Sequence, residues 1–301
     1  MPINYVTQFS DQILQLYASD LCSVGLYNSN PSINIVNTKY IRLPSITTSG
    51  YKDHNRNVLN YNTGVYGNEF KTKTLDHDRN IEFFIDPMDV DETNQVLSIQ
   101  NIQTDFEQRQ AIPELDCYTF SKIHSELKKV APEHITETEL KTSNILEKLD
   151  KVVEQMENDS VPMSRCILYC TSSVKRILKN ADEIRRNLDV SSGNALDRRI
   201  ISFEDFGDIV TVPINRFKTE YNFTDGFVAD PMGTQINYMI IDPEAQVSRV
   251  KHSYIQFYAP GSDSRCADKY LYQNRRYNGT FGIDGRLEKG CYINIAKGGK
   301  A

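Results

Sequence analysis

The longest run of helical hydrophobic spacing lies in residues 86–130. Asp89 followed by Glu92 matches a capping box, which predicts that the helix begins there. Apolar residues recur at helical spacing up to Phe106 and resume beyond Pro113. We therefore expect Pro113 to kink one long helix; two ordinary helices broken at this proline are the alternative. A helix of about forty residues would be roughly 60 Å long, so an extended partner must pack along it.

Alternating apolar and polar residues predict strands on either side of a long polar segment. The strand-like stretches are 34–44, 70–75 and 80–85, and the segment before residue 70 is rich in Gly, Asn, Ser, Tyr and charge. It has too few aliphatic side chains to build a core, and a loop of that length without a function is unusual in a compact domain. These features predict an extended β-hairpin that projects from the body. Phe106 is expected to be buried against the β layer.

The remaining chain predicts a mixture of helices and strands. Residues 1–33 read as a polar arm with one amphipathic patch, and 182–197 read as a charged, exposed stretch. Helices are predicted over 142–158 and after the cap Thr171-Ser172-Ser173. Strands are predicted at 166–170, 209–212, 217–223, 236–241, 247–258, 270–277, 280–283 and 291–296. Turns are expected at 278–280 and at Asp284-Gly285. The predicted class is α+β.

Charge is distributed unevenly along the chain, whose formal net charge is −6. Residues 245–301 hold ten Lys/Arg against four Asp/Glu, whereas residues 1–150 hold thirteen against twenty-one. Surfaces of opposite sign on one chain suit self-association. The net charge argues against a nucleic-acid-binding surface over the whole molecule. No apolar run approaches the roughly 20 residues of a membrane span, so no membrane partner is expected.

No arrangement of residues that carries catalysis is recognisable. The five histidines are scattered, and neither a phosphate-binding glycine loop nor a zinc-binding HExxH is present. Asp76-His77-Asp78 is interpreted as a solvated turn rather than a metal site. The six cysteines lie far apart except for Cys166 and Cys170, whose spacing is not a CxxC, and this pattern is typical of free thiols in a reducing cytoplasm. We therefore assign no catalytic, cofactor-binding or metal-ligating residues. A soluble α+β enzyme whose active site is not recognisable from the sequence stays as an alternative function.

Three stretches carry a resemblance to a known family. Residues 75–94 (LDHDRNIEFFIDPMDVDETN), 109–123 (RQAIPELDCYTFSKI) and 260–294 resemble the major capsid proteins of tailed bacteriophages with the HK97-type fold. The resemblance implies an N-terminal arm, an extended hairpin or E loop, a P domain with a spine helix, an A domain, and a return to P-domain strands. The corresponding expected boundaries are 1–33, 34–79, 80–134, 135–245 and 246–301.

The function implied by this resemblance is structural. It is that of a virion protein whose hexamers and pentamers form an icosahedral shell around double-stranded DNA, without sequence-specific binding. Assembly in the host bacterial cytoplasm, a separate scaffolding protein and a portal protein are further expectations. The chain starts directly at the arm without a long charged helical leader, which is why the scaffold is expected to be separate. An encapsulin-like cargo compartment is the alternative within the same fold.

Contacts between subunits are expected from the hairpin, the start of the spine and the basic end of the chain. The candidates are Tyr51, Lys52, Arg56, Tyr61, Tyr66, Arg79, Asp86, Arg275 and Arg276. A wall of cations would bind packaged DNA strongly through its phosphates. We therefore expect most of the basic residues near the C-terminus to pair with carboxylates within or between subunits. These residues are Arg249, Lys251, Arg265, Lys269, Arg275 and Arg276.

Overall fold

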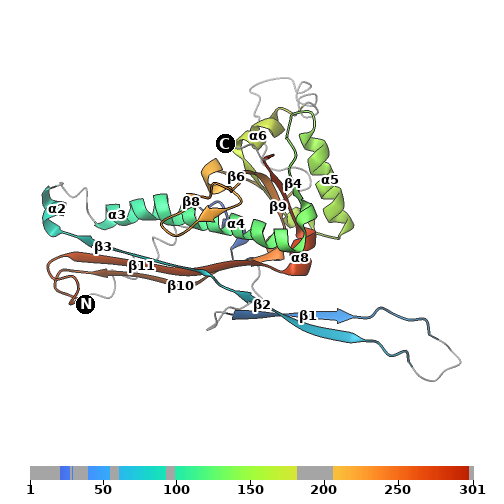
Figure 1. Cartoon of the computed structure of the whole chain (residues 1–301), viewed down its shortest axis with the longest axis horizontal. Helices are drawn as coiled ribbons and strands as arrows, with labels where there is room; N and C mark the ends of the chain where they lie inside the picture. Colours follow the sequence, from blue (N-terminus) through green and yellow to red (C-terminus); the bar gives the residue numbers. More distant parts are fainter. Residues whose placement is uncertain are drawn as a thin grey trace.

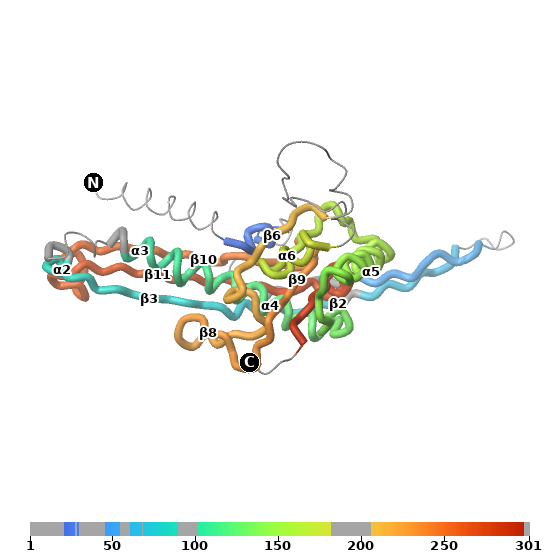
Figure 2. Tube along the Cα trace, turned by 90° about the horizontal axis from the view of Figure 1, so that it is seen from above, coloured from blue at the N-terminus to red at the C-terminus, as the bar shows by residue number. Residues whose placement is uncertain are grey.

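The computed structural model describes residues 21–27, 29, 40–54, 61–92, 99–181 and 206–297. Figure 1 shows an elongated molecule in which a long helix lies over long strands. A sheet covered by helices rises at one end, and a two-stranded hairpin projects beyond it (Figures 1 and 2). The short helical turns are η1 (Val24–Leu26), η3 (Pro132–His134), η4 (Met163–Arg165), η5 (Ile214–Arg216) and η6 (Pro243–Ala245).

One long helix, called the spine helix below, spans residues 99–130. Its segments α3 (Ile99–Phe106), the π-helical η2 (Glu107–Ala111) and α4 (Ile112–Val130) follow one another without a break. Pro113 lies in the first turn of α4, directly after the π-helical turn. Proline lacks one backbone donor, and a π turn is where a helix can widen to accommodate it. Continuation of the helix through Pro113 is thus confirmed, and the two-helix alternative is wrong.

The start of this region differs from the prediction. Helix α2 (Pro87–Glu92) begins before Asp89, so Asp89 lies in its first turn and the capping-box assignment is wrong. Asp86 occupies the capping position instead, because its Oδ1 accepts the backbone N–H of Met88 at 3.0 Å. Residues 93–98, between α2 and α3, lie outside the described residues.

A three-stranded antiparallel sheet, the long sheet, runs along the spine helix. Its order is β10 (Gln246–Tyr258), β11 (Tyr270–Gly282) and β3 (His77–Ile85). The turn expected at 278–280 is wrong, because β11 continues through these residues. Gly279 packs closely against Leu75 here: a Cβ atom at position 279 would lie only 2.1 Å from Leu75 Cδ2, so a residue without a side chain is needed. The turn expected at Asp284-Gly285 is also wrong, because these residues begin α8 (Asp284–Gly290).

Phe106 makes the expected contact with the β layer, with its ring centroid 5.6 Å from that of Phe83, but the Phe106 side chain is only half-buried.

The projecting hairpin is formed by β1 (Tyr40–Thr48) and β2 (Tyr66–Thr74). These strands pair antiparallel over their whole length, from Tyr40 opposite Thr74 to Thr48 opposite Tyr66. The predicted extended hairpin is therefore confirmed over the described residues, but its strands reach further into the polar segment than the predicted 34–44 and 70–75, and the stretch 80–85 belongs to β3 of the long sheet. Residues 34–39 of the predicted first strand lie outside the described residues. A single pair of strands has no second layer to pack on, and most of its described side chains are exposed in the isolated chain.

The second sheet has five strands and a helix layer on each face. Its order is β4 (Ile135–Thr136), β12 (Cys291–Ile295), β9 (Ile236–Ile241), β5 (Ile167–Thr171) and β6 (Asp208–Val212). Helices α5 (Ile145–Asn158) and α6 (Ser172–Lys179) pack on one face, and α4 packs on the other. Along β5, Ile167 and Tyr169 face α4, whereas Leu168 and Cys170 face α5 and α6. Burial on both faces explains why this segment reads as an apolar run.

One predicted strand in this region is wrong. Instead of a continuous strand over 217–223, the chain forms an isolated bridge between Lys218 and Gln235 and the two-residue β7 (Tyr221–Asn222), paired with β8 (Val228–Ala229). Phe217 directly follows the turn η5, and its ring is completely buried beside Phe120, with ring centroids 4.9 Å apart.

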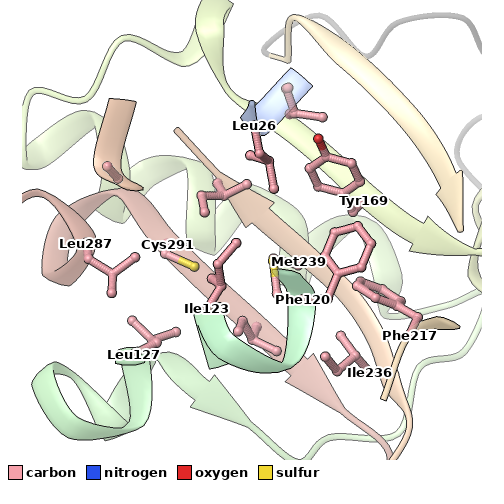
Figure 3. Packing of buried hydrophobic residues seen from close by; sticks show 14 of the residues in the cluster. Leu26, Phe120, Ile123, Leu127, Tyr169, Phe217, Ile236, Met239, Leu287 and Cys291 are labelled. Atoms are coloured by element: carbon pink, nitrogen blue, oxygen red, sulfur yellow. The ribbon is translucent and has the colours of Figure 1, made fainter. Parts of the chain in front are cut away.

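The main core joins the spine helix to the five-stranded sheet (Figure 3). Phe120 lies edge-on to both Tyr169 and Phe217, and Ile123 and Leu127 continue the apolar stripe along α4. Leu26, from the N-terminal segment, is fully buried in the same cluster. The part of the arm that is described therefore lies on its own subunit.

Replacement of Phe120 by Ala is expected to destabilise the subunit by about 3–5 kcal/mol, because it removes a fully buried ring at the junction of helix and sheet. Phe106→Ala is the matched control, with an expected loss of about 1–2 kcal/mol because the Phe106 ring is half-buried. Urea unfolding of the unassembled subunit measures both. Equal losses for the two variants would contradict this view of the core.

Candidate functional site

The projecting hairpin carries several of the most exposed large side chains among the residues that the structure describes. Tyr51, Tyr61 and Tyr66 are at least 80% exposed, and Ile46 and Phe70 are also exposed. Apolar groups gathered on an exposed surface mark an interaction site. Of the other predicted contact residues in the hairpin, the Lys52 ammonium donates to the Thr63 carbonyl at 3.1 Å, and Arg56 lies outside the described residues.

The root of this hairpin is fixed to the body by charged groups, called the root network below. The Lys73 ammonium on β2 donates to Glu126 Oε2 of α4 at 2.9 Å and to Asp284 Oδ1 of α8 at 2.7 Å. Lys71 adds a second ion pair to Asp284 at 3.0 Å, and Lys129 adds one to Glu126 at 2.9 Å. One strand of the hairpin thereby contacts two helices of the body, which sets the direction in which the hairpin projects.

Burial and hydrogen bonding shift the pKa values of the root network in opposite directions. Partial burial alone would raise the pKa of the Glu126 carboxyl, but the donors Lys73 and Lys129 outweigh it, and the net pKa is lowered. Asp284 behaves in the same way through Lys73 and Lys71. For Lys73, burial lowers the pKa, and the two carboxylates raise it overall. All of these groups are therefore held in their charged forms at neutral pH.

A second fixed point holds the N-terminal segment. Asp116 of α4 is completely buried, and its carboxylate accepts the Ser23 backbone N–H at 2.9 Å and the Ser23 hydroxyl at 2.8 Å. It also accepts the Cys22 N–H at 3.2 Å and a guanidinium N–H of Arg216 at 3.3 Å. Burial dominates and raises the pKa of Asp116 despite these donors. Sequence analysis missed this residue, although its signal is visible: it is an acid next to Leu115 and Cys117, which are both buried.

Ion pairs also tie the spine helix to the long sheet. Glu107, which is buried in the π-helical turn, accepts two hydrogen bonds from the Arg276 guanidinium, at 2.8 and 2.7 Å. The Asn274 amide donates to the same carboxylate at 2.7 Å. Two turns further on, Glu114 accepts from Arg79 at 2.7 Å and lies 3.2 Å from His77 Nε2. A cavity of about 490 Å³ lies beside these pairs, between β3, the spine helix and the β7–β8 loop.

The Asp76-His77-Asp78 tripeptide is not a solvated turn. His77 is buried at the start of β3 and stacks on Tyr118, with ring centroids 4.1 Å apart. Asp76 binds the Tyr118 hydroxyl and Lys122, whereas Asp78 pairs with Arg275. The three side chains therefore take different partners. Within the described ranges, no three His, Cys, Asp or Glu side chains are grouped in a way that would hold a metal ion.

Four of the six cations near the C-terminus pair with carboxylates of the same chain. The pairs are Arg265–Asp263, Lys269–Asp86, Arg275–Asp78 and Arg276–Glu107. The expected pairing is thus confirmed within the subunit. Lys251 lies over the Tyr277 ring, 5.0 Å from its centroid. Among the predicted contact residues, Arg79, Asp86, Arg275 and Arg276 all have partners in their own chain, and their roles between subunits stay predictions.

The fold can now be compared with solved structures. No protein-family model matches the chain, and no curated protein matches its sequence. A chain of the bacteriophage PhiM1 mature capsid aligns over 86% of this chain and 82% of its own, with a TM-score of 0.65 and 14% identity. A chain of the capsid of cyanophage P-SCSP1u aligns over 87% and 84%, with a TM-score of 0.63 and 12% identity. A chain from Mycobacterium phage Cain aligns over 92% and 90%, with a TM-score of 0.58 and 12% identity.

The chain has the HK97-type fold of tailed-phage capsid proteins. The expected α+β class and the resemblance drawn from the sequence are confirmed at the level of the fold. In the part of the chain that is described, no helix has the length and apolar character needed to span a membrane.

Replacement of Lys73 by Met is expected to destabilise the subunit by about 1–3 kcal/mol, because the largely buried Glu126 loses one of its two cations. Lys71→Met is the matched control and is expected to cost less than about 1 kcal/mol, since Lys71 is half-exposed and has one partner. Urea unfolding across a pH series measures both variants.

The sign of the pH dependence follows from the lowered carboxyl pKa values. Glu126 and Asp284 contribute stability above their ordinary pKa values, 4.5 and 3.8, and lose it as the pH falls through the lower values of the folded state. The difference between wild type and the Lys73 variant should therefore be largest near neutral pH and shrink below pH 4. A difference that grows on acidification would contradict the assigned charge states.

Proposed function

We propose that this chain is the major capsid protein of a tailed bacteriophage. Its copies assemble into an icosahedral shell that encloses double-stranded DNA, and its location is the virion. The role is structural rather than enzymatic. The fold it shares with capsid chains from phages supports this proposal.

The single observation that carries the proposal is the projecting hairpin. Its two strands of nine residues each make no second layer, and their tip exposes tyrosines at 51, 61 and 66. A monomeric enzyme gains nothing from such an arm, whereas a subunit that overlaps its neighbours buries it in an obligate interface, typically roughly 2,000 Å² or more in total. Tyrosine suits such contacts, because it combines apolar area with a polar tip.

The proposed domain boundaries follow the fold. Residues 1–33 form the arm, 34–79 the E loop, 80–134 together with 246–301 the P domain, and 135–245 the A domain. The hairpin residues Tyr51, Lys52, Arg56, Tyr61 and Tyr66 then contact a neighbouring subunit directly. Arg79, Asp86, Arg275 and Arg276 shape the surface that receives the hairpin, since their own partners hold them along the spine helix and the long sheet.

The proposed binding partners of this chain are those that a capsid shell requires. Hexamers and pentamers of this chain, a separate scaffolding protein and a portal protein are proposed to assemble in the host cytoplasm. The enclosed DNA is held without sequence-specific contacts. The four in-chain ion pairs at the basic end support this last point, because paired cations bind phosphate less strongly than unpaired ones.

Replacement of residues 50–64 by an Asn-Gly turn is expected to leave a folded subunit and to abolish shell assembly. The described residues of this loop are exposed and contribute no side chain to the core clusters, so the unfolding free energy should change by less than about 0.5 kcal/mol. The urea midpoint measures the first effect, and negative-stain microscopy with sedimentation velocity measures the second. Shells of normal size and stability from this variant would refute the bridging role of the hairpin.

A further inference from the structure

Helix α6 presents an unusually one-sided charge. Its eight residues, SSVKRILK, include three cations and no carboxylate. Lys175 is fixed by a hydrogen bond from its ammonium to Thr211 Oγ1 of β6, 3.1 Å away. Arg176 and Lys179 lie beside it, around a shallow depression of about 280 Å³. Among the described residues, none of the three forms an ion pair; together they are called the basic face.

One side of helix α5 presents the opposite charge, whereas Lys148 and Lys151 lie on another side, where Lys151 pairs with Glu147 at 2.6 Å. Asp150, Glu154 and Glu157 recur at i, i+4 and i+7, which places their side chains on one side of the helix. Glu154 and Glu157 are exposed. The opposite side of the helix carries Leu149, Met156 and the other apolar residues that pack on the five-stranded sheet. The three carboxylates are called the acidic stripe; it is the solvent side of a helix whose core side is already occupied.

The two helices that carry these charges lie next to each other on one face of the five-stranded sheet. Helix α6 contacts β5 and the edge strand β6, and α5 lies beside α6 (Figures 1 and 2). Within the described chain, no ion pair joins Glu154 or Glu157 to α6. The surfaces are therefore complementary in charge and, in a single subunit, do not satisfy each other.

We propose that the basic face of one copy docks on the acidic stripe of the next copy around each ring of subunits; the inference rests on the proposed shell function. The contact uses two different surfaces, so it is heterologous, and heterologous contacts repeat head to tail until the ring closes. Each subunit then offers its α6 to one neighbour and its α5 to the other. Opposite charges set the register and disfavour α6–α6 or α5–α5 contacts between copies.

The geometry favours a second copy over nucleic acid as the partner. The acidic stripe lies at the same end of the molecule and would repel phosphates that approached the basic face. A second copy satisfies both surfaces at once, whereas DNA satisfies only the cations. Such a contact is also sensitive to salt, because exposed charges are screened beyond a Debye length of about 8 Å at physiological ionic strength.

A charge-swap experiment tests the proposal. One variant combines Arg176→Glu with Lys179→Glu, a second combines Glu154→Lys with Glu157→Lys, and a third carries all four substitutions. All four side chains lie outside the core clusters, so the urea midpoints should match that of the wild type. Each two-substitution variant is expected to lower the fraction of protein in particles at least tenfold in sedimentation velocity. The four-substitution variant is expected to recover most of that loss.

Glu133→Lys with Glu137→Lys is the matched control, because it makes the same change in charge at exposed positions just before α5. It should assemble like the wild type. Normal particles from both two-substitution variants, or no recovery in the four-substitution variant, would overturn the docking of α6 on α5. Normal particles that fill poorly with DNA would overturn it in favour of cations facing the genome. If the wild type itself forms no particles with its neighbouring gene products, the proposed shell function fails and this inference fails with it.

Discussion

The structure depends on how the acidic side chains buried along one helix are satisfied. Glu107, Asp116 and Glu126 of the spine helix are all buried, and a buried carboxylate is costly unless cations or N–H donors surround it. Each receives its donors from a different part of the chain: Glu107 from β11, Asp116 from the N-terminal segment and Arg216, and Glu126 from the hairpin. A displaced segment would leave a buried charge without its partner. The spine helix thus specifies where three distant segments lie.

Apolar packing supplies the complementary part of this arrangement. The stripe formed by Phe120, Ile123 and Leu127 attaches the second half of the spine helix to the five-stranded sheet. The first half has no such layer and lies along the long sheet, where Phe106 is only half-buried against Phe83. Polar pairs dominate there, through Glu107 and Glu114. The helix therefore joins an end held by apolar packing to an end held mainly by directional contacts.

The root of the projecting hairpin is held in the same way, by ion pairs to carboxylates of the body. Among the described residues, its exposed strands are fixed to the body at one end, by Lys73, whose ammonium contacts two helices, and by Lys71. Beyond this root, the hairpin side chains that the structure describes are exposed. The proposed shell function needs both properties, since the arm must point in a defined direction and must also leave its surface free for another copy.

Sequence alone determined the elements whose signals are local. The periodicity through Pro113 predicted the continuous spine helix, the polar stretch between two alternating segments predicted the hairpin, and apolar runs predicted β5 and β9. The resemblance of three stretches to capsid proteins predicted the fold. Tertiary structure alone decided the features that arise from contacts between distant residues. The turn η5 stands directly before Phe217, where a strand was predicted to begin, close packing of Gly279 on Leu75 accompanies β11 through a predicted turn, and Asp86 rather than Asp89 capped α2. Asp116, His77 and Lys73 read as ordinary polar residues until the fold brings their partners to them, because the free energy of a buried charge depends on neighbours that are far away along the chain.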